Sequence, residues 1–202
     1  MTIAALILAA GASTRMGRSK PLLPWGGTNL LGWELTQLMD SCVDDIVIVT
    51  GAHSDAVRRS LGDGARYVIF NQRWSQGRAT SLAAGARALA APGRAAPEVI
   101  VIQNVDQPTR ADIIDALVAE LRTTGPDIVQ PTYRGKSGHP VVLTGRLLPE
   151  LLAVREDTFG LRAVVDAHPP RLVPMDDEPV VRIDLDTPDL LDEARQLLGV
   201  AG

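Results

Sequence analysis

IAALIL at residues 3–8 runs directly into AAGASTRMGRSK at residues 9–20. The first stretch is entirely apolar, which is typical of a strand that a parallel sheet buries on both faces. The second stretch is rich in small and basic residues, and it begins where that strand should end. Open α/β sheets bind their ligands at the carboxyl ends of their strands. The loop after residue 8 is therefore the first place to look for a functional site.

Short apolar runs alternate with longer amphipathic segments along the rest of the chain. Strands are expected at 3–8, 45–50, 66–70, 99–102, 127–132, 139–143, around 172 and at 181–185. Helices are expected at 28–39, 53–61, 80–91, 111–121, 146–153, 161–168 and 188–198. This alternation predicts an α/β fold of the Rossmann-like three-layer α/β/α type with a mostly parallel sheet. The turn at 133–138 indicates a hairpin and hence a mixed sheet, and the absence of a linker predicts one domain over residues 1–202.

The composition excludes several classes of protein. Of the 202 residues, 46% are hydrophobic and 22% are charged, which is typical of a globular chain. The net charge of −4 argues against broad binding to nucleic acid or to anionic lipid. Cys42 is the only cysteine, so no intramolecular disulfide can form and a reducing compartment is expected. The apolar stretch at 3–12 is about half of a membrane span and follows no charged leader, so we expect a cytoplasmic protein without a membrane partner.

Three features of the loop at 9–20 favour a polyphosphate ligand. Its small residues let the backbone approach a phosphate, its amides can donate to anionic oxygens, and Arg15 and Lys20 add positive charge. The phosphate-loop pattern fails because five residues, and not four, separate Gly11 from Gly17. The dinucleotide fingerprint fails because the loop has no Gly-x-Gly. On composition alone, a solvated surface loop is the competing interpretation.

The full pattern at residues 8–23 reads Leu-Ala-Ala-Gly-Ala-Ser-x-Arg-Met-Gly-x-x-Lys-x-Leu-Leu. It resembles the signature loop of the nucleotidyltransferases that join a nucleoside triphosphate to a phosphorylated acceptor. Within them it is most similar to the molybdenum cofactor nucleotidyltransferases, the MobA-like family, and above all to the cytidylyltransferases. The residues that this resemblance assigns to nucleotide binding are Leu8, Ala9, Ala10, Gly11, Ser13, Arg15 and Lys20.

A second segment resembles another nucleotide-contacting loop of the same family. It contains Asn71, Gly77 and Ser81, and the resemblance implies that all three bind the nucleotide. Trp74 in this loop is the best candidate to stack on a base. Thr80 and Ser81 are also expected to open the following helix, where their hydroxyls would cap free amides. Capping alone is the competing interpretation of this pair.

The resemblance continues toward the end of the chain, with two departures. Gly138-His139-Pro140-Val141 resembles an acceptor-side strand, which implies that His139 contacts the acceptor. A structural histidine is the alternative. Arg78 stands where family members usually have an uncharged residue, and Asn104 stands where a small or apolar residue is more common. Both departures concern the details of substrate binding.

Asp106, Asp184 and Asp186 are the candidate metal ligands. Asp106 follows an uncharged strand, and Asp106-Gln107-Pro108 resembles the metal-binding turn of the family. Asp184 and Asp186 belong to a segment that resembles its C-terminal active-site motif, and on a strand both would point to one face. Mg²⁺ prefers one or two carboxylates together with phosphate oxygens and waters, so Mg²⁺ is the expected cofactor. Helix capping is the competing interpretation of these acids.

The resemblance implies transfer of a nucleoside monophosphate to a phosphorylated acceptor, with release of pyrophosphate. The acceptor phosphate is already ionised, so catalysis would rest on positioning and charge neutralisation by Arg15, Lys20 and Asp106. Ala10 stands where guanylyl-transferring relatives have Gly, which favours CTP over GTP. The implied acceptor is molybdopterin, and the implied later partner is a molybdenum hydroxylase or its chaperone.

Three alternatives stay open on the sequence. A sugar-phosphate or other small-phosphate nucleotidyltransferase, including a guanylyltransferase, would share the catalytic residues and differ at the acceptor side. A silent nucleotide-binding regulator would bind a nucleotide without releasing pyrophosphate. A nicotinamide-dependent dehydrogenase would share the fold class, but the chain lacks its glycine fingerprint.

Overall fold

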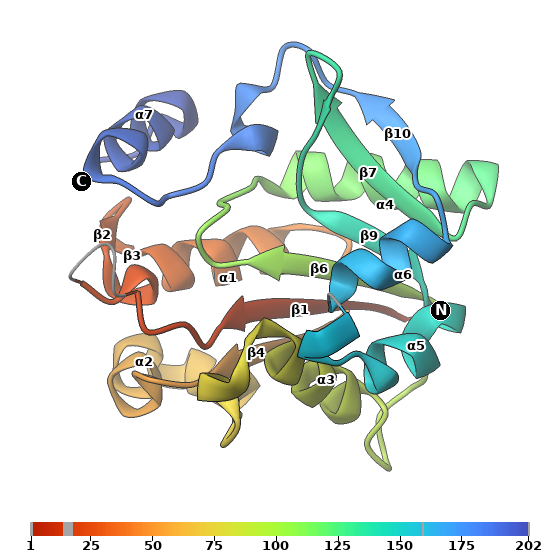
Figure 1. Ribbon diagram of the computed structural model, residues 1–202. Coiled ribbons are helices and arrows are strands. Elements are labelled where there is room, and N and C mark those ends of the chain that lie inside the picture. The colour runs from red at the N-terminus through yellow and green to blue at the C-terminus, as the bar shows by residue number, and fades with distance from the viewer. Residues whose placement is uncertain (1, 14–17, 159, 202) are drawn as a thin grey trace.

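The strand β1 (Ile3–Ala9) lies at the centre of the sheet, and all of its residues except Leu8 are buried. The computed structural model describes residues 2–13, 18–158 and 160–201. Figure 1 shows β1 between β4 (Asp45–Thr50) and β6 (Val99–Asn104), and both of these strands run parallel to it. The apolar run near the start of the chain therefore forms a central strand, as its pattern predicted.

The main sheet has eight strands in the order β10-β7-β9-β6-β1-β4-β5, with β8 paired to β7. Its other strands are β5 (Val68–Phe70), β7 (Ile128–Tyr133), β8 (Lys136–Ser137), β9 (Val141–Thr144) and β10 (Arg171–Pro174). Strand β9 is antiparallel to both β6 and β7, whereas β4 with β5 and β7 with β10 are parallel. The prediction of a mostly parallel, mixed sheet is therefore confirmed. A separate ribbon consists of β2 (Pro24–Trp25) and β3 (Thr28–Asn29).

Alternate side chains of β1 pack against two different helical layers. Ile3, Ala5 and Ile7 face one apolar core, and Ala4 and Leu6 face the other. The first layer contains α1 (Leu30–Asp40), α2 (Ser54–Leu61), α4 (Ala111–Thr124) and α7 (Pro188–Leu198). The second layer contains α3 (Arg78–Leu89), α5 (Leu148–Ala153) and α6 (Leu161–Ala167). The three-layer prediction is thus confirmed.

Short 3₁₀ helices occupy several of the connections. They are η2 (Lys20–Leu22), η3 (Gly62–Tyr67), η4 (Trp74–Gln76), η5 (Gly145–Leu147), η6 (Glu156–Thr158) and η7 (Pro179–Arg182). Among the described residues, no helix is both long enough and apolar enough to cross a membrane.

The prediction of a strand at 181–185 is wrong. Val181 and Arg182 belong to η7, and the chain continues from Ile183 without regular structure to the start of α7. Val181, Ile183 and Leu185 are buried, as alternate residues of a strand would be. Their backbone, however, bonds to loops and not to a strand, since the Leu185 N–H donates to the Asp106 carbonyl at 2.8 Å. Alternating apolar residues indicate that one side of a segment is buried. Here that side is buried although the segment does not pair with a strand of the sheet.

Candidate active site

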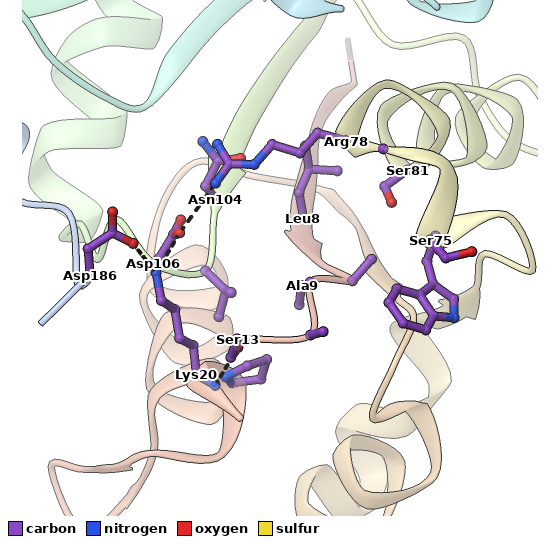
Figure 2. A pocket seen from close by; sticks show the side chains of 17 residues that line it. Leu8, Ala9, Ser13, Lys20, Ser75, Arg78, Ser81, Asn104, Asp106 and Asp186 are labelled. Carbon is purple, nitrogen blue, oxygen red and sulfur yellow. Dashed lines mark hydrogen bonds and ion pairs between the residues drawn. The ribbon is translucent and has the colours of Figure 1, made fainter. Parts of the chain in front are cut away.

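A cleft of about 310 Å³ opens at the carboxyl ends of β1 and β6 (Figure 2). Because β4 and β6 lie on opposite sides of β1, the strand order reverses here, and such points are where open α/β sheets form ligand clefts. The predicted site residues that line the cleft are Leu8, Ala9, Ala10, Gly11, Ser13, Lys20, Gly77, Ser81, Asp106 and Asp186. Asn71, His139 and Asp184 do not line it, and Arg15 lies outside the described residues.

The loop after β1 is held close to its neighbours by two local features. The Ser13 hydroxyl accepts a hydrogen bond from the Lys20 N–H at 3.0 Å, and Ser13 itself adopts a positive φ of 53°. At Gly51, just after β4, an added Cβ would lie 2.4 Å from the Ala10 carbonyl oxygen and 2.5 Å from Trp74 Cβ. Only glycine fits at that position, so the loop, the end of β4 and the tryptophan can pack together.

Lys20 lies in the wall of the cleft, among three carboxylates. Its Nζ is 3.0 Å from Asp106 Oδ2, 2.8 Å from Asp186 Oδ1 and 4.0 Å from Asp184 Oδ1. Burial by itself would lower the pKa of Lys20, but the hydrogen bonds and negative charges of Asp186 and Asp106 outweigh it and raise the pKa above 10.5. The ammonium is therefore charged throughout the physiological pH range. Sequence pattern had marked Lys20 for phosphate binding but contained no sign of these partners.

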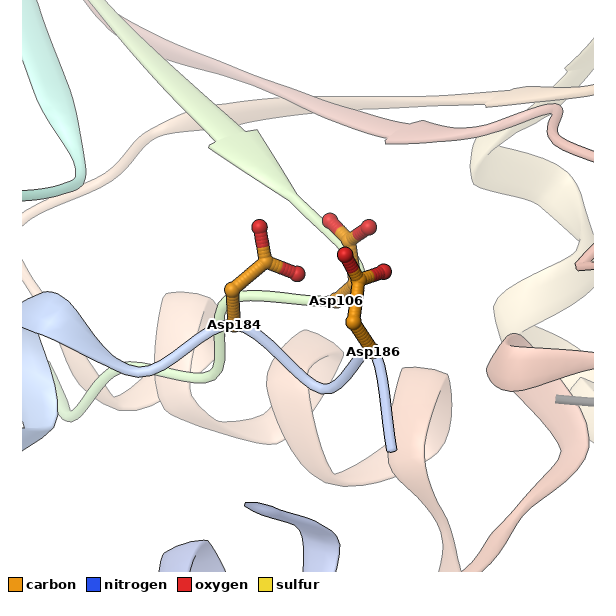
Figure 3. A group of neighbouring side chains, drawn as sticks. All are labelled: Asp106, Asp184 and Asp186. Carbon is orange, nitrogen blue, oxygen red and sulfur yellow. The ribbon is translucent and has the colours of Figure 1, made fainter. Parts of the chain in front are cut away.

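Asp106, Asp184 and Asp186 converge from two distant segments (Figure 3). One oxygen from each carboxylate lies within 4.8 Å of the others. The burial of Asp184 and the charges of Asp106 and Asp186 raise the pKa of Asp184, and its Oδ1 accepts no hydrogen bond from the described residues. Clustered carboxylate oxygens with unused acceptor capacity are the donors that hard divalent cations prefer. The residues therefore fit a divalent metal ion.

The second predicted nucleotide loop is organised by a buried amide. The Asn71 side chain donates to Thr80 Oγ1 at 2.9 Å and to Ser81 Oγ at 3.0 Å. It is 4% exposed, so it positions the two hydroxyls while Ser81 reaches the cleft. Nucleotide contact by Asn71 remains a prediction. Trp74 lines the cleft as well.

The expectation that Thr80 and Ser81 open the helix is wrong. Helix α3 begins at Arg78, and Gly77 is its N-cap residue. The Glu156 carboxylate, from η6, accepts the Ala79 N–H at 2.9 Å. One amide of the helix N-terminus is thus already satisfied by a residue that lies 77 positions away, which the local sequence could not indicate.

His139 holds the segment that carries the two C-terminal carboxylates. Its N–H donates to the Val181 carbonyl at 2.8 Å, and its ring Nε2 lies 2.7 Å from the Ile183 carbonyl. Because a carbonyl can only accept, Nε2 carries a proton. Burial lowers the pKa of His139 to about 4, although the Ile183 carbonyl opposes that shift. The neutral ring thus supports the backbone next to Asp184, and acceptor contact by His139 remains a prediction.

We expect His139 to make the protein less stable in mild acid. Its pKa is about 4 in the folded state, whereas an unperturbed histidine, as in the unfolded chain, has a pKa of 6.5, so the unfolded chain binds more protons between these values. Stability should therefore fall as the pH drops below 6.5, by about 3 kcal/mol at most on reaching pH 4. Urea unfolding from pH 7 to pH 4 would measure this slope for the wild type and for His139→Gln, which can still donate to Ile183. Equal slopes in the two proteins would contradict the assignment.

The cleft contains residues to which the sequence had assigned no role or only a doubtful one. The cleft is also lined by Ala12, Pro21, Ser75 and Val105, and by both departures from the family pattern, Arg78 and Asn104. Glu34 of α1 is a further surprise, because it occupies an apolar stripe and is 2% exposed. Neither of its carboxylate oxygens has a hydrogen-bond partner among the described residues. Burial, together with the Asp106 charge, raises the pKa of Glu34 well above its usual value.

Three curated relatives span most of this chain. It is 26% identical over 185 residues to the molybdenum cofactor cytidylyltransferase of Escherichia coli strain K12, which covers 91% of each chain. It is 30% identical over 172 residues to a probable molybdenum cofactor guanylyltransferase of Mycolicibacterium paratuberculosis, covering 83% of this chain and 82% of that one. It is also 27% identical over 176 residues, 83% of each chain, to the nicotine blue oxidoreductase of Paenarthrobacter nicotinovorans.

Solved structures and a family comparison complete the assignment. The crystal structure of Rv0371c from Mycobacterium tuberculosis H37Rv superposes with a TM-score of 0.78 at 25% identity, covering 97% of this chain and 98% of that one. A structure of Rv0371c in complex with manganese gives a TM-score of 0.73 at 24% identity, covering 97% and 99%. The sequence matches the MobA-like NTP transferase domain over residues 5–172. With the loop, the cleft and the fold all in agreement, this chain belongs to the MobA-like NTP transferase family.

Proposed function

We propose that this chain transfers CMP from CTP to the terminal phosphate of molybdopterin and releases pyrophosphate. The observation that carries the proposal is the position of Lys20, which Asp106 and Asp186 hold at the wall of the cleft beside the loop after β1. A buried cation next to exposed loop amides suits a triphosphate. The E. coli cytidylyltransferase, matched over 91% of each chain, supports the choice of nucleotide and acceptor.

The reaction needs little from the protein beyond positioning and charge. An oxygen of the acceptor phosphate attacks the α-phosphorus of CTP, and a new P–O bond forms. The bond from the α-phosphorus to the bridging oxygen breaks, and its electron pair leaves with pyrophosphate. The attacking phosphate is already ionised near neutral pH, so no general base is required. Lys20 neutralises phosphate charge, Arg15 is proposed to do the same, and Ser81 contacts the nucleotide.

We further propose that Asp106, Asp184 and Asp186 hold Mg²⁺. The convergence of their oxygens within 4.8 Å supports this, as does the manganese complex of Rv0371c. When bound, the cation would supply Lewis-acid stabilisation of negative charge on the phosphates. Asp106 and Asp186 would present the cation to the triphosphate, since both line the cleft beside the loop after β1.

Thermal stability with CTP, GTP, ATP, UTP and NAD, each with and without MgCl₂, tests the choice of ligand. A ligand at about 100 times its Kd adds ~2.7 kcal/mol, which for a chain of this length raises the Tm by roughly 5–10 °C. We expect such a shift with CTP only in the presence of Mg²⁺. A GTP-specific shift would favour guanylyl transfer, as in the M. paratuberculosis relative, and a shift with NAD would refute the proposal.

The acceptor is tested by turnover. CTP labelled at the α-phosphate should yield a CMP conjugate when molybdopterin is present, with one pyrophosphate released per conjugate. Sugar 1-phosphates serve as competing acceptors. Transfer to a sugar phosphate alone would replace molybdopterin as the acceptor, and CTP binding without any pyrophosphate release would identify a silent nucleotide-binding protein.

A further inference from the structure

Arg78 is a cation of the cleft that the fold does not need. It is the first residue of α3, and 78% of its side chain is exposed. Among the described residues, its guanidinium makes an ion pair with Asp106 and no hydrogen bond. A positive charge at a helix N-terminus is opposed by the helix dipole, so the position is unfavourable for the helix itself. The arginine therefore calls for an explanation outside the stability of the protein.

The place of the guanidinium supplies that explanation. Arg78 reaches Asp106 Oδ2 at 3.8 Å, which is the same oxygen that Lys20 Nζ contacts at 3.0 Å. Figure 2 shows the two cations approaching Asp106 from different directions, Arg78 from α3 and Lys20 from the loop after β1. At 3.8 Å the guanidinium is too distant to hydrogen-bond the carboxylate, so its donors are available to a ligand.

In-line displacement explains why two cations would be placed in this way. The entering and leaving groups lie on opposite sides of the α-phosphorus, so each needs its own counter-charge. Lys20, whose side chain is 10% exposed, belongs to the loop proposed to hold the triphosphate. Arg78 is far more exposed and approaches Asp106 from a different direction, so its guanidinium can meet a group other than the triphosphate. A planar guanidinium also matches the oxygens of a phosphate monoester in a bidentate contact.

We propose that Arg78 binds the phosphate group of the acceptor, the group that carries the attacking oxygen. This inference rests on the proposed function, since it assumes nucleotidyl transfer to a phosphorylated acceptor. It also accounts for one departure of the chain from its family pattern: the substitution adds a binding residue for the second substrate of the cleft.

Arg78→Gln, Arg78→Lys and the control Arg87→Gln test the proposal by steady-state kinetics. Arg87 lies in the last turn of the same helix and does not line the cleft. Arg78→Gln should raise the KM for the acceptor roughly 10- to 100-fold and leave the KM and Kd for CTP within about twofold. Arg78→Lys should lose less, because it keeps the charge but not the bidentate contact. Arg87→Gln should match the wild type, and all three Tm values should stay within about 2 °C of it.

Two results would overturn the role of Arg78. One is an unchanged acceptor KM in Arg78→Gln, and the other is a loss of CTP affinity that equals its loss of acceptor affinity. The proposed function is tested independently of these variants, by the nucleotide and the acceptor that the wild-type protein uses. If the wild type uses another nucleotide or another phosphorylated acceptor, the same kinetics with that pair still decide the role of Arg78. Absence of transfer to every phosphorylated acceptor would overturn both proposals.

Discussion

Asp106→Ala should lower the kcat for nucleotidyl transfer by about 10²–10³-fold or more and leave the protein folded. The carboxylate belongs to the three-acid cluster, contacts Lys20 at 3.0 Å and is one of the two cluster acids that line the cleft, so its loss removes both a metal ligand of the proposed site and a partner of Lys20. The fold should survive for two reasons. Lys20 keeps its contact with Asp186 at 2.8 Å, and the Asp106 carbonyl that accepts the Leu185 N–H belongs to the backbone.

Turnover, circular dichroism and Tm of the purified variant would measure these effects. Asp166→Asn is the matched control, because Asp166 is an exposed acid of α6 that pairs with Arg162 at 3.6 Å, outside the cleft. The control should retain wild-type turnover. An Asp106→Ala protein that kept about a tenth of wild-type turnover would refute the role of this carboxylate, since removal of one electrostatic group typically costs far more.

Lys20→Met should reduce both activity and stability. The change keeps a side chain of similar length but leaves the Asp106, Asp184 and Asp186 carboxylates without their shared cation. We expect turnover to fall by about 10²–10³-fold through loss of phosphate neutralisation. In metal-free buffer we also expect a loss of about 1–3 kcal/mol in the free energy of unfolding, because the buried Asp106 and the half-buried Asp186 lose a charged hydrogen-bond partner.

Added metal tests whether Lys20 stabilises the protein by neutralising the three carboxylates. Millimolar MgCl₂ should raise the Tm of Lys20→Met more than that of the wild type, since a divalent cation can neutralise the carboxylates that the ammonium no longer reaches. Lys136→Met is the control, because Lys136 is the only other lysine and lies exposed on β8, away from the cleft. A stability of Lys20→Met that does not respond to metal would count against a cation site at these acids.

Much of the fold was predictable because local chemistry agreed with it. The continuous apolar run at 3–8 marks a strand that is covered on both faces, and it forms the central strand β1. The turn at 133–138 predicted the antiparallel return that makes the sheet mixed. The strand predicted at 181–185 failed because alternating burial there comes from packing over the loop after β6, not from strand pairing.

Some residues of the candidate site were also predicted from the sequence, and others were found only in the structure. The sequence pattern, together with the family resemblance, predicted functional roles for the loop after β1, Lys20 and Asp106, and the structure brings all three to one cleft. Arg78 could be noted from its charge, but its reach to Asp106 depends on where α3 begins. Nothing in the sequence indicated that Glu34 is buried, because an acid within an apolar stripe can also lie at the edge of the stripe and reach solvent.

Properties that depend on residues close together in the sequence were therefore predictable from the chain: the central strand, the position of the first loop at the end of that strand and the class of fold. Those that depend on segments distant in sequence came only from the packed molecule. These are the enclosure of Lys20 by acids 86 and 166 positions away, the capping of α3 by Glu156 and the neutral state of His139. The reason is physical, because charges interact through space and burial is set by the whole core, and neither distance nor burial is encoded in a local run of residues.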